Sequence, residues 1–117
     1  MARTFYRIIR GDQATEDDFL SNFARGRPHR RSEVLDPEEH RSISAFARLE
    51  DALTVQARFP RLGTSIAELE LADDDPEVIV RKASVDPNDS HHNLQGEPAA
   101  FLRRVRQVSP IPPSADV

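Results

Sequence analysis

The sequence predicts an α+β fold in one small domain, with two main helices against a largely antiparallel sheet. The chain has 117 residues, which suits a single hydrophobic core. Segments that alternate polar and apolar residues with a period of two are interspersed with segments of helical period. No repeat or low-complexity tract divides the chain. We therefore place one domain at residues 1–109 and an extended proline-rich tail at residues 110–117.

The first elements are a strand and a helix. Residues 4–9 are rich in β-branched and aromatic side chains, which favour a strand, and a Gly-Asp turn signal follows them. Thr15 then offers an N-cap before acidic residues, and three apolar residues recur at helical spacing. We expect a helix of roughly three turns at residues 16–25, ended by Gly26 in the left-handed conformation.

The next segment combines a loop, a helical turn and a strand. Residues 25–31 are basic and interrupted by a proline, which predicts a loop. A capping pattern at Asp36 predicts a short helical turn. Residues 42–47 alternate polar and apolar side chains, so we expect a strand with Ile43 and Phe46 near its buried ends.

The middle of the chain contains the most regular patterns. Residues 48–59 follow the helical period up to Pro60, and residues 64–71 show the cleanest strand alternation in the protein. Residues 73–76 form an acidic turn with a proline, and residues 78–80 are a short apolar strand. We expect this strand to return beside its predecessor as in a hairpin.

The last third begins with a polar stretch. Residues 84–96 lack apolar periodicity, so we expect a long exposed loop that carries function. Residues 97–102 predict a short helix with Pro98 at its first position, and residues 103–109 predict the last strand.

Composition excludes several classes of site. The chain has no cysteine, which removes disulfides, thiolate zinc sites, iron–sulfur clusters and cysteine nucleophiles. No segment has the apolar length of a secretory signal or a membrane span, so we expect a cytoplasmic protein that does not insert in membranes. The net charge of -4 argues against broad non-specific binding of nucleic acid.

Three clusters of charged or titratable residues are candidate sites. Residues Arg25–Arg31 could contact phosphates or nucleic acid, but acidic residues follow them and no aromatic residue is interleaved, which favours a solvated loop. His91 and His92 are adjacent and lack metal-ligand spacing, so we expect solvated loop histidines. Residues 73–75 lack the ligand spacing of a calcium loop. The sequence therefore predicts no metal site.

Three separated segments carry a resemblance to a family. They are Phe5-Tyr6-Arg7-Ile8-Ile9, then Ser42-Ile43-Ser44-Ala45-Phe46 followed by a helix and Ile66-Ala67-Glu68-Leu69, and finally His92-Asn93-Leu94-Gln95-Gly96-Glu97. In this order they resemble a group of small uncharacterised bacterial proteins, which in turn resemble minimal ADP-ribosyltransferase-like domains. The resemblance implies an enzyme of toxin–antitoxin or effector type, with NAD as its co-substrate, that transfers ADP-ribose or cleaves NAD.

The resemblance also implies roles for individual residues. Arg7 would hold the NAD phosphate or ribose, Ser44 would shape the nicotinamide pocket, and Glu97 would be the acidic catalytic residue. Tyr6 and Phe46 would stack on the nicotinamide or adenine ring. From the residues alone, Arg7 is equally a surface residue of its strand, and Glu97 is equally an acid that favours a helix N-terminus.

Two other functions are open at this level. A non-catalytic relative would bind a protein partner through residues 84–96 or an exposed sheet edge. A nucleic-acid-binding domain would use residues Arg25–Arg31, and its affinity would fall with salt. The sequence sets neither the target nor the oligomeric state.

Overall fold

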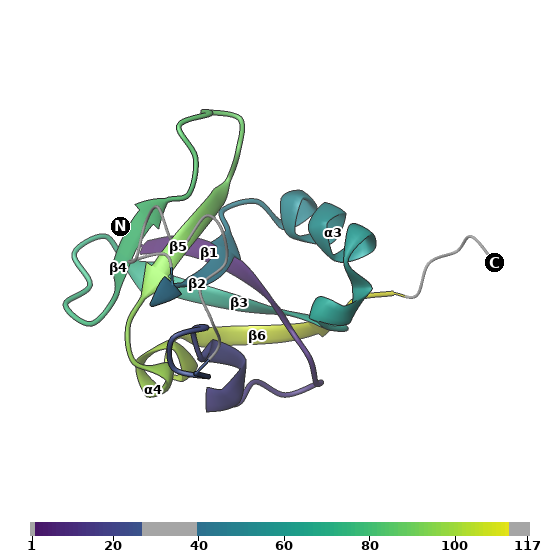
Figure 1. Ribbon diagram of the computed structural model, residues 1–117, viewed down its shortest axis with the longest axis horizontal. Helices are drawn as coiled ribbons and strands as arrows, with labels where there is room; N and C mark the ends of the chain where they lie inside the picture. The colour runs from purple at the N-terminus through teal and green to yellow at the C-terminus, as the bar shows by residue number, and fades with distance from the viewer. Residues whose placement is uncertain (1, 27–39, 113–117) are drawn as a thin grey trace.

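Six antiparallel strands form one sheet in the order β4-β5-β2-β1-β3-β6 (Figure 1). The computed structural model describes residues 2–26 and 40–112, which form the predicted single small α+β domain. The strands are β1 (Ala2–Ile9), β2 (Ile43–Phe46), β3 (Ser65–Ala72), β4 (Ile79–Lys82), β5 (His91–Gln95) and β6 (Val105–Pro110). The α-helices are α3 (Leu49–Arg58) and α4 (Pro98–Leu102), and the 3-10 turns are η1 (Glu16–Phe19) and η2 (Pro60–Leu62).

The central strand β1 is paired unequally on its two sides. It pairs with β3 along its whole length, from Ala2↔Ala72 to Ile9↔Ser65. Its pairing with β2 is confined to Tyr6↔Phe46. Side chains must therefore hold the two strands together beyond that point.

One face of the sheet carries the main core. Phe5 of β1 points to this face, where Phe19 of η1 stacks on Phe101 of α4 at 5.8 Å between ring centroids. The buried members of this core are Phe5, Phe19, Ile43, Ala45, Leu69, Leu71, Val78, Leu94 and Phe101. Burial of these side chains fixes η1 and α4 against the strands.

The opposite face carries a smaller core under α3. Side chains alternate along β1, so Tyr6 and Ile8 point away from the main core and pack with Phe46, Ala52 and Ile66. Figure 1 shows α3 and α4 on opposite sides of the central strands. Ile8, Phe46 and Val55 of this smaller core also line a surface hollow.

Most of the predicted elements are confirmed. Strands form near residues 4–9, 64–71 and 103–109, and the strand at 42–47 buries Ile43 and Phe46 as expected. The predicted helices at 48–59 and 97–102 are α3 and α4, and Pro98 begins α4.

The helix predicted at residues 16–25 is wrong. The 3-10 turn η1 and a separate hydrogen-bonded turn at residues 22–26 form instead of one continuous helix, and the extended Leu20 lies between them. The backbone carbonyl of Asp18 accepts a hydrogen bond from Arg7 Nε, so that carbonyl is drawn to β1 instead of the next helical turn. Gly26 does adopt the predicted left-handed conformation, with φ 70.

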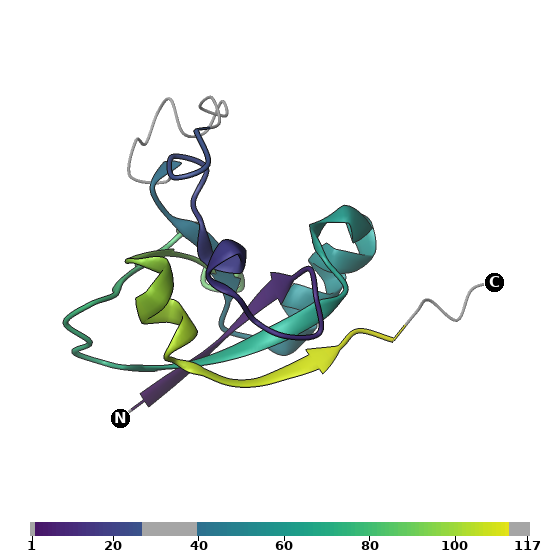
Figure 2. The same cartoon turned by 90° about the horizontal axis from the view of Figure 1, so that it is seen from below.

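The predicted hairpin return after residue 76 is also wrong. β4 pairs with β5 at one edge of the sheet, and β3 lies between β1 and β6. Figure 2 shows the connection between β3 and β4, residues 73–78, as a loop that projects from the strands. Asp75 lies in this connection, and its carboxylate accepts hydrogen bonds from Arg104 Nε at 2.6 Å and from Arg104 Nη2 at 2.9 Å. These bonds hold the chain away from β3.

The long exposed loop expected at residues 84–96 is wrong because its second half is β5. His91 and His92 lie on this strand and are not solvated loop residues. His92 is 6% exposed, its ring meets Phe5 edge-on, and its Nδ1 lies 2.6 Å from the carbonyl oxygen of Ser90. That bond satisfies a polar ring whose burial the sequence pattern does not predict.

The helical turn expected at Asp36 and the residues 113–117 of the predicted tail lie outside the described residues. Among residues 2–26 and 40–112, no helix has both the length and the apolar character needed to cross a bilayer.

Candidate functional site

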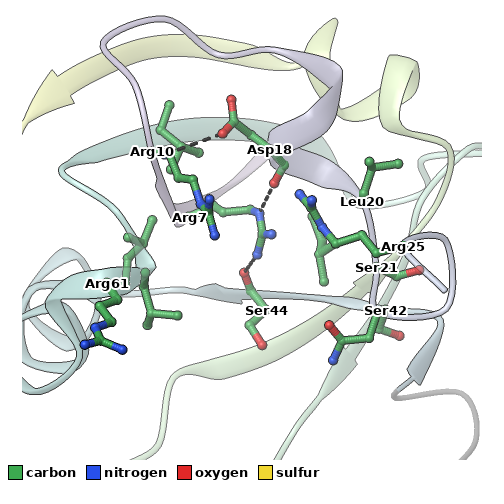
Figure 3. A pocket seen from close by; sticks show the side chains of 14 residues that line it. Arg7, Arg10, Asp18, Leu20, Ser21, Arg25, Ser42, Ser44 and Arg61 are labelled. Atoms are coloured by element: carbon green, nitrogen blue, oxygen red, sulfur yellow. Dashed lines mark hydrogen bonds between the residues drawn. The ribbon is translucent and has the colours of Figure 1, made fainter. Parts of the chain in front are cut away.

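Arg7 bridges three segments at the point where β1 and β2 separate. Its Nε donates to the carbonyl oxygen of Asp18 at 2.8 Å, and its Nη1 donates to the carbonyl oxygen of Ser44 at 2.7 Å (Figure 3). The guanidinium thus replaces missing backbone pairing between β1 and β2 and also anchors η1. These bonds use two of its five N–H groups.

The charge on Arg7 is poorly compensated. Burial lowers the pKa of Arg7 to about 10, attraction to Asp18 opposes this, and repulsion from Arg25 adds to it. The two acceptors nearest the guanidinium are neutral carbonyls. The side chain is therefore still protonated at neutral pH, in surroundings that disfavour its charge.

A basic hollow of about 240 Å³ opens around Arg7. Its charged lining consists of Arg7, Arg10, Arg25 and Arg61 against one carboxylate, Asp18. Figure 3 shows the Arg7 guanidinium between Asp18 and Ser44, with Arg25 and Arg61 on opposite sides of it. Ser21, Asn22 and Ser42 add polar groups to the wall. The hollow therefore concentrates positive charge on a chain whose net charge is -4.

The turn η2 carries Arg61 and Leu62 to the rim of this hollow. Gly63 follows η2 and passes so close to β1 that a Cβ at this position would lie 2.1 Å from the carbonyl oxygen of Ile9. Gln56 Nε2 also donates to the carbonyl oxygen of Gly63 at 3.0 Å. Glycine at position 63 is thus required for the approach that places Arg61 beside Arg7.

An apolar hollow of about 710 Å³ adjoins the basic one. Its walls come from α3, η2, β2 and β5, and its apolar lining is Ile8, Phe46, Val55, Phe59 and Leu62. Asp89 and His91 are its polar residues from the β5 side. The His91 ring stacks on Phe46 at 5.2 Å between centroids, with 24° between the ring planes.

The residues predicted from the sequence fall into three groups. Arg7 and Ser44 lie together and line both hollows, while Phe46 lines the apolar hollow. Tyr6 packs under α3 and lines neither hollow. Glu97 is exposed at the N-cap of α4 and also lines neither. The structure therefore brings together three of the five residues named by the resemblance: Arg7, Ser44 and Phe46.

Sequence reasoning missed the residues that complete the two hollows. Arg10, Asp18 and Arg61 have no local motif, and they meet only because η1 and η2 fold back on β1. Phe59, after α3, and Asp89, before β5, are distant in sequence and both line the apolar hollow. The alternation along β1 did give a local signal, because it places Arg7 and Ile8 on opposite faces of the strand.

The other clusters considered as sites have structural roles or lie outside the described residues. In the basic segment, Arg25 reaches the carbonyl oxygen of Asp17, and residues 27–31 are outside the described range. Asp75 is bound by Arg104. Within residues 2–26 and 40–112, no three His, Asp or Glu side chains are grouped so that they could hold a metal ion.

Comparison of the chain with protein-family models, curated proteins and solved structures gives no match.

Proposed function

We propose that this protein binds NAD in the basic hollow and acts on it as an ADP-ribosyltransferase-like transferase or as a glycohydrolase. One observation carries the proposal: Arg7 and Ser44, the residues that the resemblance assigns to the dinucleotide, are hydrogen-bonded neighbours in a hollow with four arginines and one carboxylate. Guanidinium groups match the oxygen geometry of a pyrophosphate. NAD carries such a group.

Arg7 is suited to anion binding because its orientation is already fixed. Its bonds to the carbonyls of Asp18 and Ser44 hold the guanidinium in place, so a ligand would not have to order it. An anion would also offset the charge that burial disfavours. Arg10, Arg25 and Arg61 are exposed and can close on the ligand from the rim.

The proposed reaction breaks the bond between the ribose C1′ and the nicotinamide nitrogen of NAD. Nicotinamide leaves with the bonding electrons, a nucleophilic oxygen or nitrogen of an acceptor bonds to C1′, and the acceptor's proton is released. With water as the acceptor the products are ADP-ribose, nicotinamide and a proton. A carboxylate that faces the ribose would stabilise the positive charge developing at C1′.

Glu97 enters the proposal only through the resemblance. Glu97 lines neither hollow. The variant Glu97→Gln therefore tests the role that the resemblance implies for Glu97 separately from the roles of the residues in the hollows. Loss of turnover with unchanged NAD binding would assign the carboxylate role to Glu97. Unchanged turnover would remove Glu97 and leave the carboxylates of the hollows as candidates.

The test is release of nicotinamide from NAD by the purified protein, with and without candidate protein acceptors. Arg25→Ala and Arg61→Ala alter exposed side chains, so we expect them to fold and to lower kcat/KM by about tenfold or more. Arg106→Ala is the matched control, since Arg106 is an exposed arginine on β6 that pairs with Glu70 outside both hollows. Absence of both NAD binding and nicotinamide release would overturn the proposal.

A further inference from the structure

The two hollows form one trough with two chemically different ends. They share Arg7, Ile8, Ser44, Arg61 and Leu62 in their linings. The basic end is the smaller, at about 240 Å³, and the apolar end is about 710 Å³. A ligand that fills the trough must therefore carry a compact anionic group next to a larger apolar group.

The apolar end is built from side chains that the fold leaves partly open. Phe59 is 53% exposed and Leu62 is 48% exposed, although both border a hollow. Phe46 and Val55 supply further apolar wall. Aromatic and aliphatic walls around a hollow with few polar groups are typical of sites that bind a flat ring.

Asp89 places a carboxylate, a hydrogen-bond acceptor, at this apolar end. Its Oδ1 accepts the backbone N–H of His91 at 2.9 Å, which fixes the carboxylate at the start of β5. A carboxylate accepts several hydrogen bonds, so Asp89 can also accept an N–H or O–H from a ligand. No carboxylate other than Asp89 is among the residues that line the apolar hollow.

We infer, on the basis of the proposed NAD site, that the apolar hollow receives the flat ring of a nucleotide whose phosphates lie in the basic hollow. Phe59 contacts the ring, and Asp89 accepts a hydrogen bond from the ring or from its ribose. The substrate class is therefore a ring-bearing nucleotide, and an inorganic polyphosphate or a sugar phosphate would occupy only the basic end. The ring is either the adenine or the nicotinamide of NAD, which share this chemistry.

The test is calorimetric titration with four probes: NAD, ADP-ribose, nicotinamide mononucleotide and inorganic pyrophosphate. Phe59→Ala and Asp89→Asn change the apolar end, and Phe23→Ala is the matched control, since Phe23 is 51% exposed and lines neither hollow. We expect Phe59→Ala to weaken NAD binding about tenfold and to leave pyrophosphate binding unchanged. Asp89→Asn should weaken NAD binding about three- to tenfold.

The probes also identify the ring. A loss at Phe59→Ala that ADP-ribose shares and nicotinamide mononucleotide does not places adenine in the apolar hollow, and the opposite pattern places nicotinamide there. NAD binding that falls at Arg61→Ala but is unchanged at Phe59→Ala and Asp89→Asn would overturn this inference and leave the NAD site standing. Failure of all three nucleotides to bind the unmodified protein would overturn both.

Discussion

Arg7 and Arg104 each donate hydrogen bonds to more than one acceptor, but the acceptors of Arg7 are neutral carbonyls and those of Arg104 include carboxylates. Arg104 faces carboxylates: both oxygens of Asp75 bind it, and Glu77 lies 3.7 Å away. Hydrogen bonding to Asp75 raises the pKa of Arg104 above its ordinary value. Arg7 instead has two carbonyl partners, and burial lowers its pKa to about 10, although attraction to Asp18 opposes this and repulsion from Arg25 adds to it.

The difference indicates which arginine is available to a ligand. The charge of Arg104 is neutralised within the fold, where the ion pair ties the connection between β3 and β4 to the end of α4. The hydrogen-bond acceptors of Arg7 are neutral carbonyls, so the fold orients its charge and compensates it only in part, through attraction to the Asp18 carboxylate. A partly buried cation of this kind marks a candidate functional site, because a bound anion would compensate the remaining charge.

The largest effect is expected on stability at the Arg104 region. Arg104→Met removes the partner of Asp75, whose side chain is only 6% exposed, so the free energy of unfolding should fall by about 3 kcal/mol. The neighbouring Arg103 is 59% exposed in its pair with Glu77, and Arg103→Met should cost less than about 1 kcal/mol. Urea unfolding of the two variants measures both values.

Arg7→Met sharpens this comparison in the same experiment. It loses two hydrogen bonds but also removes a poorly compensated charge, so it should destabilise the protein less than Arg104→Met does. A loss of stability at Arg7 that equals or exceeds the loss at Arg104 would contradict the difference we draw between the two regions.

A smaller effect is expected from acid. Hydrogen bonding to Arg104 holds the pKa of Asp75 below its ordinary value of 3.8, so this pair stabilises the fold above that pH. The stabilisation is lost as pH falls through the lowered pKa, by about 1.4 kcal/mol for each unit of the shift. The stability difference between the unmodified protein and Arg104→Met should therefore shrink below pH 3.8. A difference that stays constant down to acid unfolding would exclude the Asp75 pair as its cause.

The predictable part of the fold is the part with local signals. Residues of β3 alternate cleanly and α3 follows the helical period, so both were expected from the sequence. β5 could not be predicted because His91 and His92 interrupt the apolar alternation. The contact of the His92 ring with Phe5 and its bond to the Ser90 carbonyl account for the burial of that ring. The partner of β4 could not be predicted, since the ion pair at Asp75 joins residues distant in sequence.

The candidate site was predictable to a similar extent. The resemblance named Arg7 and Ser44, and the sheet brings them into contact. Arg61 and Phe59 could not have been named, because they reach the trough through the close approach of Gly63 to Ile9. Glu97 was named by the same resemblance, and in the structure it is the N-cap residue of α4.

The most direct test of the difference between the two arginines is the change in melting temperature that NAD causes at constant ionic strength. We predict that NAD raises Tm for the unmodified protein and by a similar amount for Arg104→Met, since mass action stabilises any folded form that binds it. Arg7→Met should show no such rise. The absence of a shift in the unmodified protein, or an equal shift in Arg7→Met, would contradict the conclusion that Arg7 is the cation to which the ligand binds.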